Sequence, residues 1–371
     1  MNRHCSPNLV PLAALAAAAV LSLPAAAQDM KFLRIGTGSI SGVYFPVGGL
    51  IASAISHPPG ASLCGQGGSC GVPGLVAVAQ ASRGSVANVR QIAAGRIESA
   101  LVQADIAYFA VKGVGIFSGA KAVPGLRAIA SLYPEAVHVV VRKKSRILAI
   151  GDLRRKRVSL DLKGSGTRSI ANLVLREHGI DAKSLRLRNS QVGPAVDRLE
   201  AGSIDAFFFV GGFPAPSIAR LAREVPLRLL PISGKPAASI RKADPFLAAV
   251  TVPASVYGRA EPTRTLAVGA LWTVSDKVDA DLVYGITRAL WHPTSRLILD
   301  QGPPPARRIR LKNALKGVAI PLHEGAQRFY REKGLMAKPA PKAKSAPKAK
   351  SAPKAKPQTP AKPTPKPPPK T

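Results

Sequence analysis

The sequence predicts an α/β protein of two lobes. Short apolar runs alternate with amphipathic stretches along the chain, which is the pattern of strands and helices around a mostly parallel sheet. Between its two ends the chain has about 305 residues, a length at which one hydrophobic core usually gives way to two. Two long runs rich in β-branched residues, 132–143 and 246–258, could each cross from one lobe to the other. Two crossings would make the second lobe an insertion in the first.

The expected elements follow in pairs. Four apolar strands each precede an amphipathic helix, at residues 32–35 and 45–55, 75–82 and 85–95, 97–103 and 104–113, and 157–162 and 167–179. We therefore assign residues 28–141 to the first part of lobe 1 and residues 142–246 to lobe 2. Residues 247–336 complete lobe 1 and add C-terminal helices.

The two ends differ from the rest in composition. Arg3 precedes the apolar run VPLAALAAAAVLSL, and the small residues AAA end at Ala27, so residues 1–27 read as a signal peptide cleaved after Ala27. A signal anchor is the alternative, but a run of about 14 residues is shorter than the roughly 20 that a membrane span needs. Residues 337–371 are rich in Lys, Pro and Ala and are expected to form a disordered tail, whose deletion should leave ligand affinity unchanged.

Charge argues for anionic partners without naming one. The formal net charge is +33, and residues 28–336 carry +22 of it once the ten lysines of the tail and Arg3 are set apart. A basic surface favours anions in general. Aromatic residues make up only 5% of the chain, too few for the stacking surface of a single-strand nucleic-acid binder. We expect no nucleic acid as a partner.

The stretch IGTGSISGVYFPVGGLIASAI, residues 35–55, places a glycine-rich turn between a strand and a helix. Its glycines are spaced G-x-G-x-x-x-G, which is not the dinucleotide fingerprint, and residues 30–97 contain no Asp or Glu to bind a ribose. No G-K-[ST] phosphate loop occurs either. A turn of this kind points backbone N–H groups and hydroxyls at the space above the helix, so it suits a carboxylate or another anion.

Two more turns repeat this device. All three combine glycines with hydroxyls before a helix, and they contain Thr37, Ser39 and Ser41; Ser82, Gly84 and Ser85; and Gly164, Ser165, Gly166 and Thr167. One such turn is usually a plain helix cap, but three drawn from both lobes predict a shared cleft. Arg83 and Arg168 lie beside two of the turns, and we expect both to be solvated.

Catalytic and metal motifs are not apparent. Gly67, Ser69 and Gly71 spell G-x-S-x-G, but this copy lies in a loop and not between a strand and a helix. The six histidines are scattered without metal-ligand spacing, at positions 4, 57, 138, 178, 292 and 323. We expect no metal, no cofactor and no enzyme activity. An enzyme would have to use Asp105 or Tyr133, and neither has an evident partner.

The cysteines predict one disulfide. Cleavage of the signal would remove Cys5 and leave Cys64 and Cys70, with five residues between them in a glycine-rich loop. Outside the cytoplasm such a pair closes readily. We expect a Cys64–Cys70 bond that stabilises a local turn.

Several stretches together resemble one known family. They are RIGTGSISGVYFPVGG, VAQASRGSVANVRQIAAGRIESALVQADIAY, RAIASLYPEAVHVVVR, GDLRRKRVSLDLKGSGTR and GSIDAFFFVGGFPAPSIARLA. In this order they are similar to the TAXI family of solute-binding proteins of TRAP (tripartite ATP-independent periplasmic) transporters, over residues 32 to 336. The resemblance implies a type II periplasmic-binding-protein fold, in which two α/β lobes joined by two strands close on a small ligand in the periplasm.

The resemblance also implies a ligand site and partners. The matching positions are Gly38, Ser39, Gly42 and Tyr44; Ser82, Ser85 and Asn88; Gln103 and Asp105; and Gly164, Ser165, Gly166 and Thr167. Phe213 stands where many members have His. The family binds glutamate, glutamine or dicarboxylates, so we expect a small anionic solute of C4 or C5 size, delivered to TRAP membrane permease subunits by a monomer. A binding protein of an ATP-driven importer and a ligand-sensing subunit of a membrane signalling system are the alternatives.

Overall fold

A computed structural model describes residues 30–259 and 261–337 of the 371-residue chain. The predicted signal peptide and the predicted tail from residue 338 onward lie outside the described residues. The strands are β1 (Lys31–Gly36), β2 (Ser56–His57), β3 (Val72–Pro73), β4 (Leu75–Gln80), β5 (Ser99–Gln103), β6 (Leu126–Arg142), β7 (Arg157–Ser159), β8 (Arg186–Leu187), β9 (Ala206–Gly211), β10 (Leu227–Leu229), β11 (Ala248–Val252) and β12 (Thr263–Ser275).

The helices fill the intervals between these strands. The α-helices are α1 (Tyr44–Ile55), α2 (Ser85–Ala93), α3 (Ala104–Lys112), α4 (Gly166–Glu177), α5 (Val192–Glu200), α6 (Pro216–Glu224), α7 (Gly234–Ala243), α8 (Ala280–Leu290), α9 (Pro293–Gln301), α10 (Pro304–Arg307) and α11 (Glu324–Glu332). Short 3-10 turns lie at Gly115–Phe117, Ile150–Leu153, Ala182–Ser184, Ala254–Tyr257 and Leu311–Asn313. The four predicted strand–helix pairs are all present, within a few residues of their expected limits.

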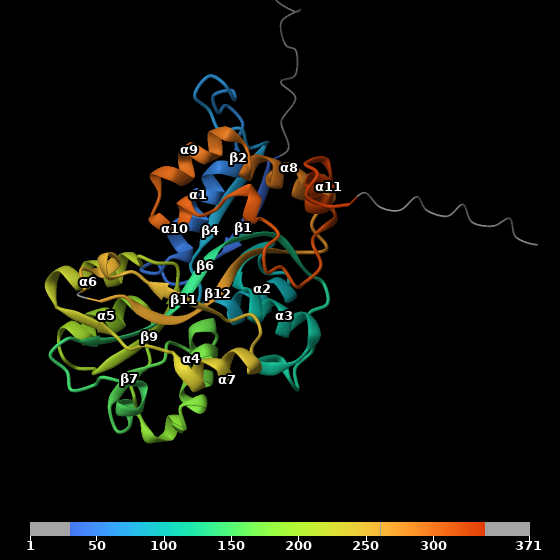
Figure 1. The fold of residues 1–371 in the computed structure, drawn as a ribbon. Helices are drawn as coiled ribbons and strands as arrows, with labels where there is room; N and C mark the ends of the chain where they lie inside the picture. Colours follow the sequence, from blue (N-terminus) through green and yellow to red (C-terminus); the bar gives the residue numbers. More distant parts are fainter. Residues whose placement is uncertain (1–29, 260, 338–371) are drawn as a thin grey trace, which may run out of the picture.

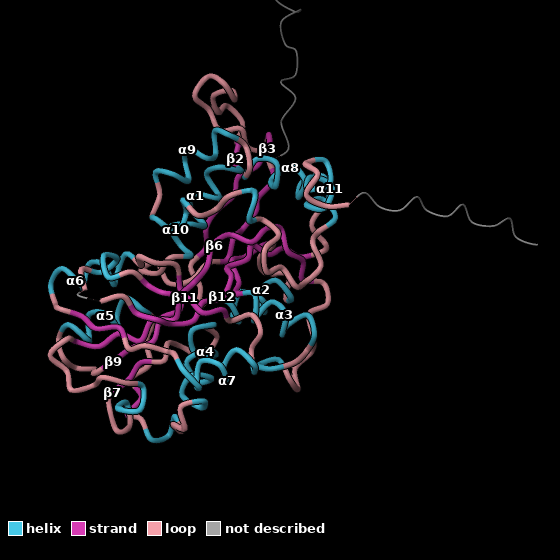
Figure 2. Tube along the Cα trace, viewed as in Figure 1, coloured by secondary structure: helices cyan, strands magenta, loops and turns pink. Residues whose placement is uncertain are grey.

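The described strands form one curled sheet that runs through both lobes (Figure 2). Its order is β3-β2-β4-β1-β5-β12-β6-β9-β7-β8, with β10 paired to β6 and β11 to β12. β1 is parallel to β4 and β5, and β7 is parallel to β8 and β9, as the strand–helix alternation predicts. β12 and β6 run antiparallel to their neighbours in the middle of the sheet.

β6 and β12 join the two lobes. The first part of β6, residues 126–136, pairs with β12, and residues 136–141 pair with β9 of the second lobe. The last part of β12 pairs with β5, and its first part pairs with β11. The fold class, two α/β lobes joined by two strands, is confirmed. The second crossing strand is β12 and not residues 246–258, where the equally β-branched but short and mostly exposed β11 runs alongside it. The lobe limits given above remain a proposal.

Helices cover both faces of the sheet (Figure 1). In the first lobe α1 packs on β4 and against α8 and α9, while α2 and α3 pack on β5 and β12. In the second lobe α4 and α7 lie together with α4 on β9, and α5 and α6 lie together with α5 on β9. The hydrophobic core follows this layering rather than the lobes. One cluster contains Leu33 and Phe207 and the other contains Val86 and Phe208, so each core runs through both lobes on one face of the sheet.

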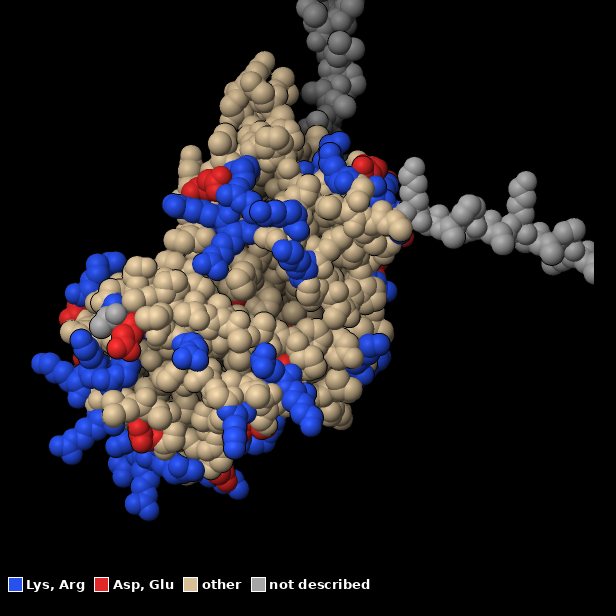
Figure 3. Space-filling model, in the orientation of Figure 1, with Lys and Arg blue, Asp and Glu red and all other residues tan. Residues whose placement is uncertain are grey.

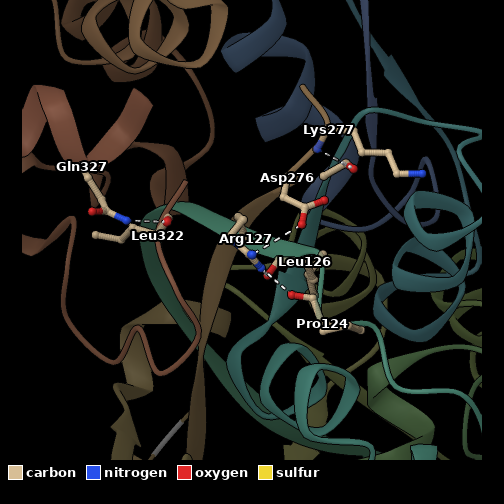
Figure 4. Close-up of polar contacts among 8 residues, drawn as sticks. Pro124, Leu126, Arg127, Asp276, Lys277, Leu322 and Gln327 are labelled. Carbon is tan, nitrogen blue, oxygen red and sulfur yellow. Dashed lines mark hydrogen bonds and ion pairs between the residues drawn. The ribbon is translucent and has the colours of Figure 1, made fainter. Parts of the chain in front are cut away.

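The ends of the two crossing strands are tied together on the first lobe (Figure 4). Arg127 donates from Nη1 to the carbonyl of Pro124 at 2.5 Å and from Nη2 to Asp276 Oδ2 at 3.4 Å. Nearby, Gln327 Nε2 on α11 donates to the carbonyl of Leu322 at 2.9 Å. The contacts of Arg127 hold the start of β6 in the first lobe. The middle of β6 lies between the two lobes. Among the helices of the described residues, none is long and apolar enough to cross a membrane.

Candidate functional site

A cavity of about 60 Å³ lies between the two lobes. A water molecule needs roughly 10–15 Å³ on this measure, so the space holds only a small solute. Most of the predicted ligand residues line it, namely Gly38, Ser39, Gly42, Tyr44, Ser85, Gln103, Ser165, Gly166 and Thr167. The structure therefore brings the three predicted turns together from both lobes.

The lobes touch each other around this cavity. The backbone N–H of Ala87 on α2 donates to the carbonyl of Gly164 at 2.9 Å, and Gln191 Nε2 donates to the carbonyl of Ser82 at 2.9 Å. A Cβ placed on Gly166 would lie 1.7 Å from Gln103 Oε1, so a larger residue there would displace the Gln103 side chain. The structure is thus a closed arrangement of the cleft.

Four helices begin at the cavity wall. The residues at their N-caps all line the space, and they are Val43 for α1, Gly84 for α2, Ser165 for α4 and Gln191 for α5. The caps of α1, α2 and α5 make no side-chain hydrogen bond to the first turn, which leaves backbone N–H donors there without a side-chain cap. Helix N-termini favour negative charge, so their convergence makes the wall rich in donors for an anion.

Local contacts explain why each turn holds its position. Thr37, fully buried after β1, donates from its backbone and its hydroxyl to the carbonyl of Gln80, at 2.9 and 2.8 Å. Asn88 Nδ2 on α2 donates to the carbonyls of Thr37 and Leu101, at 2.7 and 2.8 Å. On the second lobe, the N–H of Val210 donates to Thr167 Oγ1 at 3.1 Å. Asn88 therefore supports the site from behind and does not line the cavity.

Two carboxyl groups line the cavity that the turns did not predict. Glu135, in the middle of β6, is 1% exposed, and the hydroxyl of Tyr44 donates to its Oε2 at 2.7 Å. Burial raises the pKa of Glu135 to about 8, although the hydrogen bond from Tyr44 lowers it and Asp105 raises it further. Asp161, after β7, is half-buried, and burial raises its pKa to about 6. The cavity wall therefore contains two acidic side chains, whereas residues 30–97, which supply two of the turns, contain none.

The other predicted residues lie around the cavity and do not line it. Ser82 and Gly164 border a second hollow at its mouth. Asp105 is fully buried at the start of α3, and neither of its oxygens has a hydrogen-bond partner among the described residues. Burial raises the pKa of Asp105 to about 8, and nearby Asp244 adds to this. Phe213 packs under the guanidinium of Arg308, 4.5 Å from the ring centroid, where the second lobe meets the C-terminal segment.

The hollow at the mouth differs from the cavity in charge. It is an open groove of about 610 Å³ whose basic residues are Arg83, Arg90 and Lys163, all exposed. Among the described residues that line it there is no Asp or Glu. It shares Arg83 and Gln191 with the cavity, so the two spaces adjoin. Lys and Arg also outnumber acids over both lobes on the face shown in Figure 3.

The sequence missed several lining residues, among them Glu135, Asp161, Gln191 and Phe209. Gln191 caps a helix that no glycine turn precedes, and Phe209 belongs to an apolar strand, so nothing local marks them. Glu135 did carry a signal. It is the one acid in the strand LRAIASLYPEAVHVVVR, which is otherwise buried along most of its length. A buried charge in such a strand costs free energy unless it is paired or hydrogen-bonded, so an acid there marks a candidate site.

The predicted disulfide is present. Cys64 and Cys70 are bonded in the loop between β2 and β3, six positions apart. His292 lies close enough that one ligand atom from each of the three residues falls within 4.8 Å of the others, but the two sulfurs are bonded to each other. The bond closes a loop on the outer end of the first lobe (Figure 1).

The fold and the cavity define a two-lobed α/β protein with a closed space between its lobes. Residues 35–334 match the NMT1-like family, and because this is most of the chain, the protein belongs to that family. This match is coarser than the resemblance to TAXI proteins, which remains a prediction.

Several solved structures are similar at low identity. The periplasmic sulfonate-binding protein of a putative sulfonate ABC transporter from Methylobacillus flagellatus KT is 14% identical, with a TM-score of 0.42, over 83% of this chain and 96% of that one. The alkanesulfonate-binding protein of Xanthomonas axonopodis pv. citri is 16% identical, with a TM-score of 0.41, over 84% and 96%. A binding component of an ABC phosphonate transporter from Pseudomonas aeruginosa is 11% identical, with a TM-score of 0.46, over 73% and 79%.

Proposed function

We propose that the protein is a periplasmic solute-binding protein that holds a small anion between its lobes and hands it to a membrane permease. The observation that carries this proposal is the convergence of four helix N-termini, two from each lobe, on one small cavity. Backbone N–H groups at these positions bind carboxylates or similar anions without an arginine. Because both lobes supply donors, a solute that fills the cavity favours their closure.

The volume of the cavity limits the size of the solute. A space of about 60 Å³ corresponds to about four to six water positions at the usual minimum per water. That is too small for a disaccharide, and a C4 or C5 acid fits only if the cleft widens slightly to admit it. The basic groove at the mouth supports an anion as well, because Arg83, Arg90 and Lys163 raise its local concentration there.

The type of permease is open to two proposals. The TAXI resemblance favours a TRAP permease, driven by an ion gradient. The NMT1-like family match does not name a TRAP protein, and two of the three similar solved structures named above are described as components of ABC transporters. We therefore put the ATP-driven importer, the alternative reading of the sequence, first. The permease genes beside this one would decide between them.

The residues of the cavity support solute binding better than they support catalysis. Asp105 and Tyr133, the two candidates for a base or a nucleophile, are buried away from the lining, and their oxygens have no hydrogen-bond partner among the described residues. A ligand-sensing subunit of a membrane signalling system would use the same cavity. It differs in its partner, which co-purification of a membrane kinase in place of a permease would reveal.

Native mass spectrometry and thermal unfolding test the proposal together. We expect freshly purified protein to carry a small acid, and we expect succinate, glutamate or 2-oxoglutarate to raise the melting temperature while sugars do not. A ligand at 100 times its dissociation constant adds about 2.7 kcal/mol to the free energy of unfolding. A shift by a sugar with none by any acid would contradict the anion site, and no shift by any small solute would contradict the function.

A further inference from the structure

We propose that Glu135 is a specificity-determining residue of the cavity, which keeps a proton in the closed state and donates it to an oxygen of the bound anion. This inference rests on the proposed function and adds a feature to it. An anion bound this way is taken up together with a proton.

The contacts of Glu135 leave one of its oxygens for a solute. The hydroxyl of Tyr44 on α1 donates to Oε2 at 2.7 Å, and Oε1 has no hydrogen bond within the described residues. A protonated carboxyl has one O–H donor and an acceptor oxygen. Since Oε2 accepts from Tyr44, the proton belongs on Oε1. Glu135 lines the cavity, so this O–H is a donor at the same space that the helix N-termini surround.

Among the residues that the structure describes, no cation pairs with Glu135. The titratable groups near it are Tyr44 on α1, Tyr133 on its own strand, Asp105 on α3, and Asp161 across the cavity. Arg83 is the one basic residue among the described lining residues, and it is exposed at the mouth, with no ion pair to Glu135. A buried carboxylate without a positive partner is strongly disfavoured, and the group takes up a proton instead.

An anion in the cavity strengthens this preference. Its own negative charge would repel an ionised Glu135 across a few ångströms of low-dielectric space, whereas a protonated Glu135 attracts it. Burial already raises the pKa of Glu135 to about 8 in the closed structure. In an open cleft, where water reaches the group, a glutamate has an ordinary pKa of about 4.3. Closure on an anion between these two values therefore binds one proton.

The sign of the pH effect follows. Below the titration of the open form, Glu135 is protonated in both states, and affinity does not depend on it. Between the titrations of the open and closed forms, binding takes up a proton, so the dissociation constant of an acid rises about tenfold per pH unit. A solute whose ammonium group paired with an ionised Glu135 would show the opposite trend.

Isothermal titration calorimetry with 2-oxoglutarate, succinate and glutamate as probes tests this inference. Titrations at pH 6 and pH 7.5, each in two buffers of different ionisation enthalpy, give the number of protons bound with the acid. Wild-type protein should take up close to one proton at pH 7.5 and bind the acid at least tenfold more weakly there than at pH 6. Glu135→Gln, whose amide is a permanent donor of the same shape, should bind without proton uptake at pH 7.5 and with no more than the shallow pH dependence that Asp161 contributes near pH 6.

Two variants serve as controls. Asp161→Asn should keep the proton uptake at pH 7.5, because the pKa of Asp161, about 6, lies lower. Glu98→Gln removes an exposed pair with Arg34 far from the cavity and should behave as wild type.

The outcomes separate the inference from the function on which it rests. Binding of an acid without proton uptake, or loss of acid binding in Glu135→Gln, would overturn the inference and leave the solute-binding function standing. Binding of glutamate alone that strengthens with pH and fails in Glu135→Gln would mean that Glu135 acts as a carboxylate. Failure of all three acids to bind the wild-type protein would reject the anion site itself.

Discussion

The cavity between the lobes and the groove at its mouth adjoin, but the charged residues that line them differ in sign. The groove has three exposed basic residues and no acid among the described residues that line it. The cavity has two carboxyls, Glu135 and Asp161, four helix N-termini, and one basic side chain among its described lining residues, Arg83 at the mouth. A solvated groove can attract an anion from a distance, but a closed cavity must satisfy every buried polar group. The difference indicates that the groove governs encounter and the cavity governs selection.

The cavity and the groove also differ in the parts of the chain that form their walls. The groove borders two of the turns and adds exposed side chains such as Arg90, while the cavity is formed mainly by turns that buried contacts such as Asn88 with Thr37 and Leu101 keep in place. Changes inside the cavity should therefore alter affinity, and changes in the groove should alter the association rate.

The largest effect on affinity should come from a substitution that prevents the two lobes from approaching each other. Gly166→Val would place a Cβ 1.7 Å from Gln103 Oε1 and force the Gln103 side chain out of its position between the lobes. We expect the affinity for the acid to fall at least about 100-fold, or about 2.7 kcal/mol, in a titration of folded protein.

Gly49→Val is the matched control, since a Cβ at Gly49 on α1 meets nothing within 4 Å. It should keep the affinity of the wild type. Equal losses in the two variants would show that folding, and not closure, was disturbed.

A smaller loss should follow from removing one donor inside the cavity. Ser39 is half-buried and lines the space, and its Oγ accepts only a long contact of 3.4 Å from the N–H of Ser41 among the described residues. Ser39→Ala should weaken binding by about 1–3 kcal/mol if the hydroxyl serves the anion. The loss should appear in the dissociation rate. An unchanged dissociation constant would remove Ser39 from the site.

Neutralising the groove should change kinetics more than affinity. Arg90→Gln and Lys163→Gln combined, with Arg83 kept because it also lines the cavity, should slow association of the acid by up to about tenfold at low salt, with less effect as salt screens the charges. Stopped-flow measurements at two ionic strengths would show this. A large change in the dissociation rate instead would mean that the groove belongs to the binding site, and the contrast between the two spaces would fail.

The disulfide should matter least for binding. Cys64→Ser with Cys70→Ser opens a loop of few residues, so the free energy of unfolding should fall by at most about 2 kcal/mol on the chain-entropy account. Because the loop lies at the outer end of the first lobe, the affinity for the acid should not change. Chemical denaturation and titration of the same double variant check both statements.

The sequence predicted the layers of the fold and the backbone part of the site. Strand–helix alternation and the three glycine turns depend on local patterns, which a single chain displays directly. The turns converge because each follows the end of a strand in one continuous sheet, so the pairing β1–β4–β5 and β7–β9 brings their ends to one edge.

The site residues that the sequence did not predict depend on tertiary structure. Glu135 and Tyr44 are 91 positions apart and meet because β6 passes the N-terminus of α1, which no local pattern reveals. Residues 246–258 and β12 are both rich in β-branched residues, and only pairing with β5 distinguishes the strand that crosses. Glu135 and Asp161 come to the cavity from β6 and from the second lobe, so the acid-free stretch 30–97 gives no sign of them.

Hydrogen–deuterium exchange with and without the acid tests the central claim most directly. If the solute closes the two lobes on the cavity, peptides covering residues 36–44, 82–88 and 163–168 should gain protection together, because they contain the helix N-termini and the bond from Ala87 to Gly164. Residues 176–186, on the outer side of the second lobe, should not change. Protection confined to one lobe, or located at the outer surface, would contradict a solute site between the lobes.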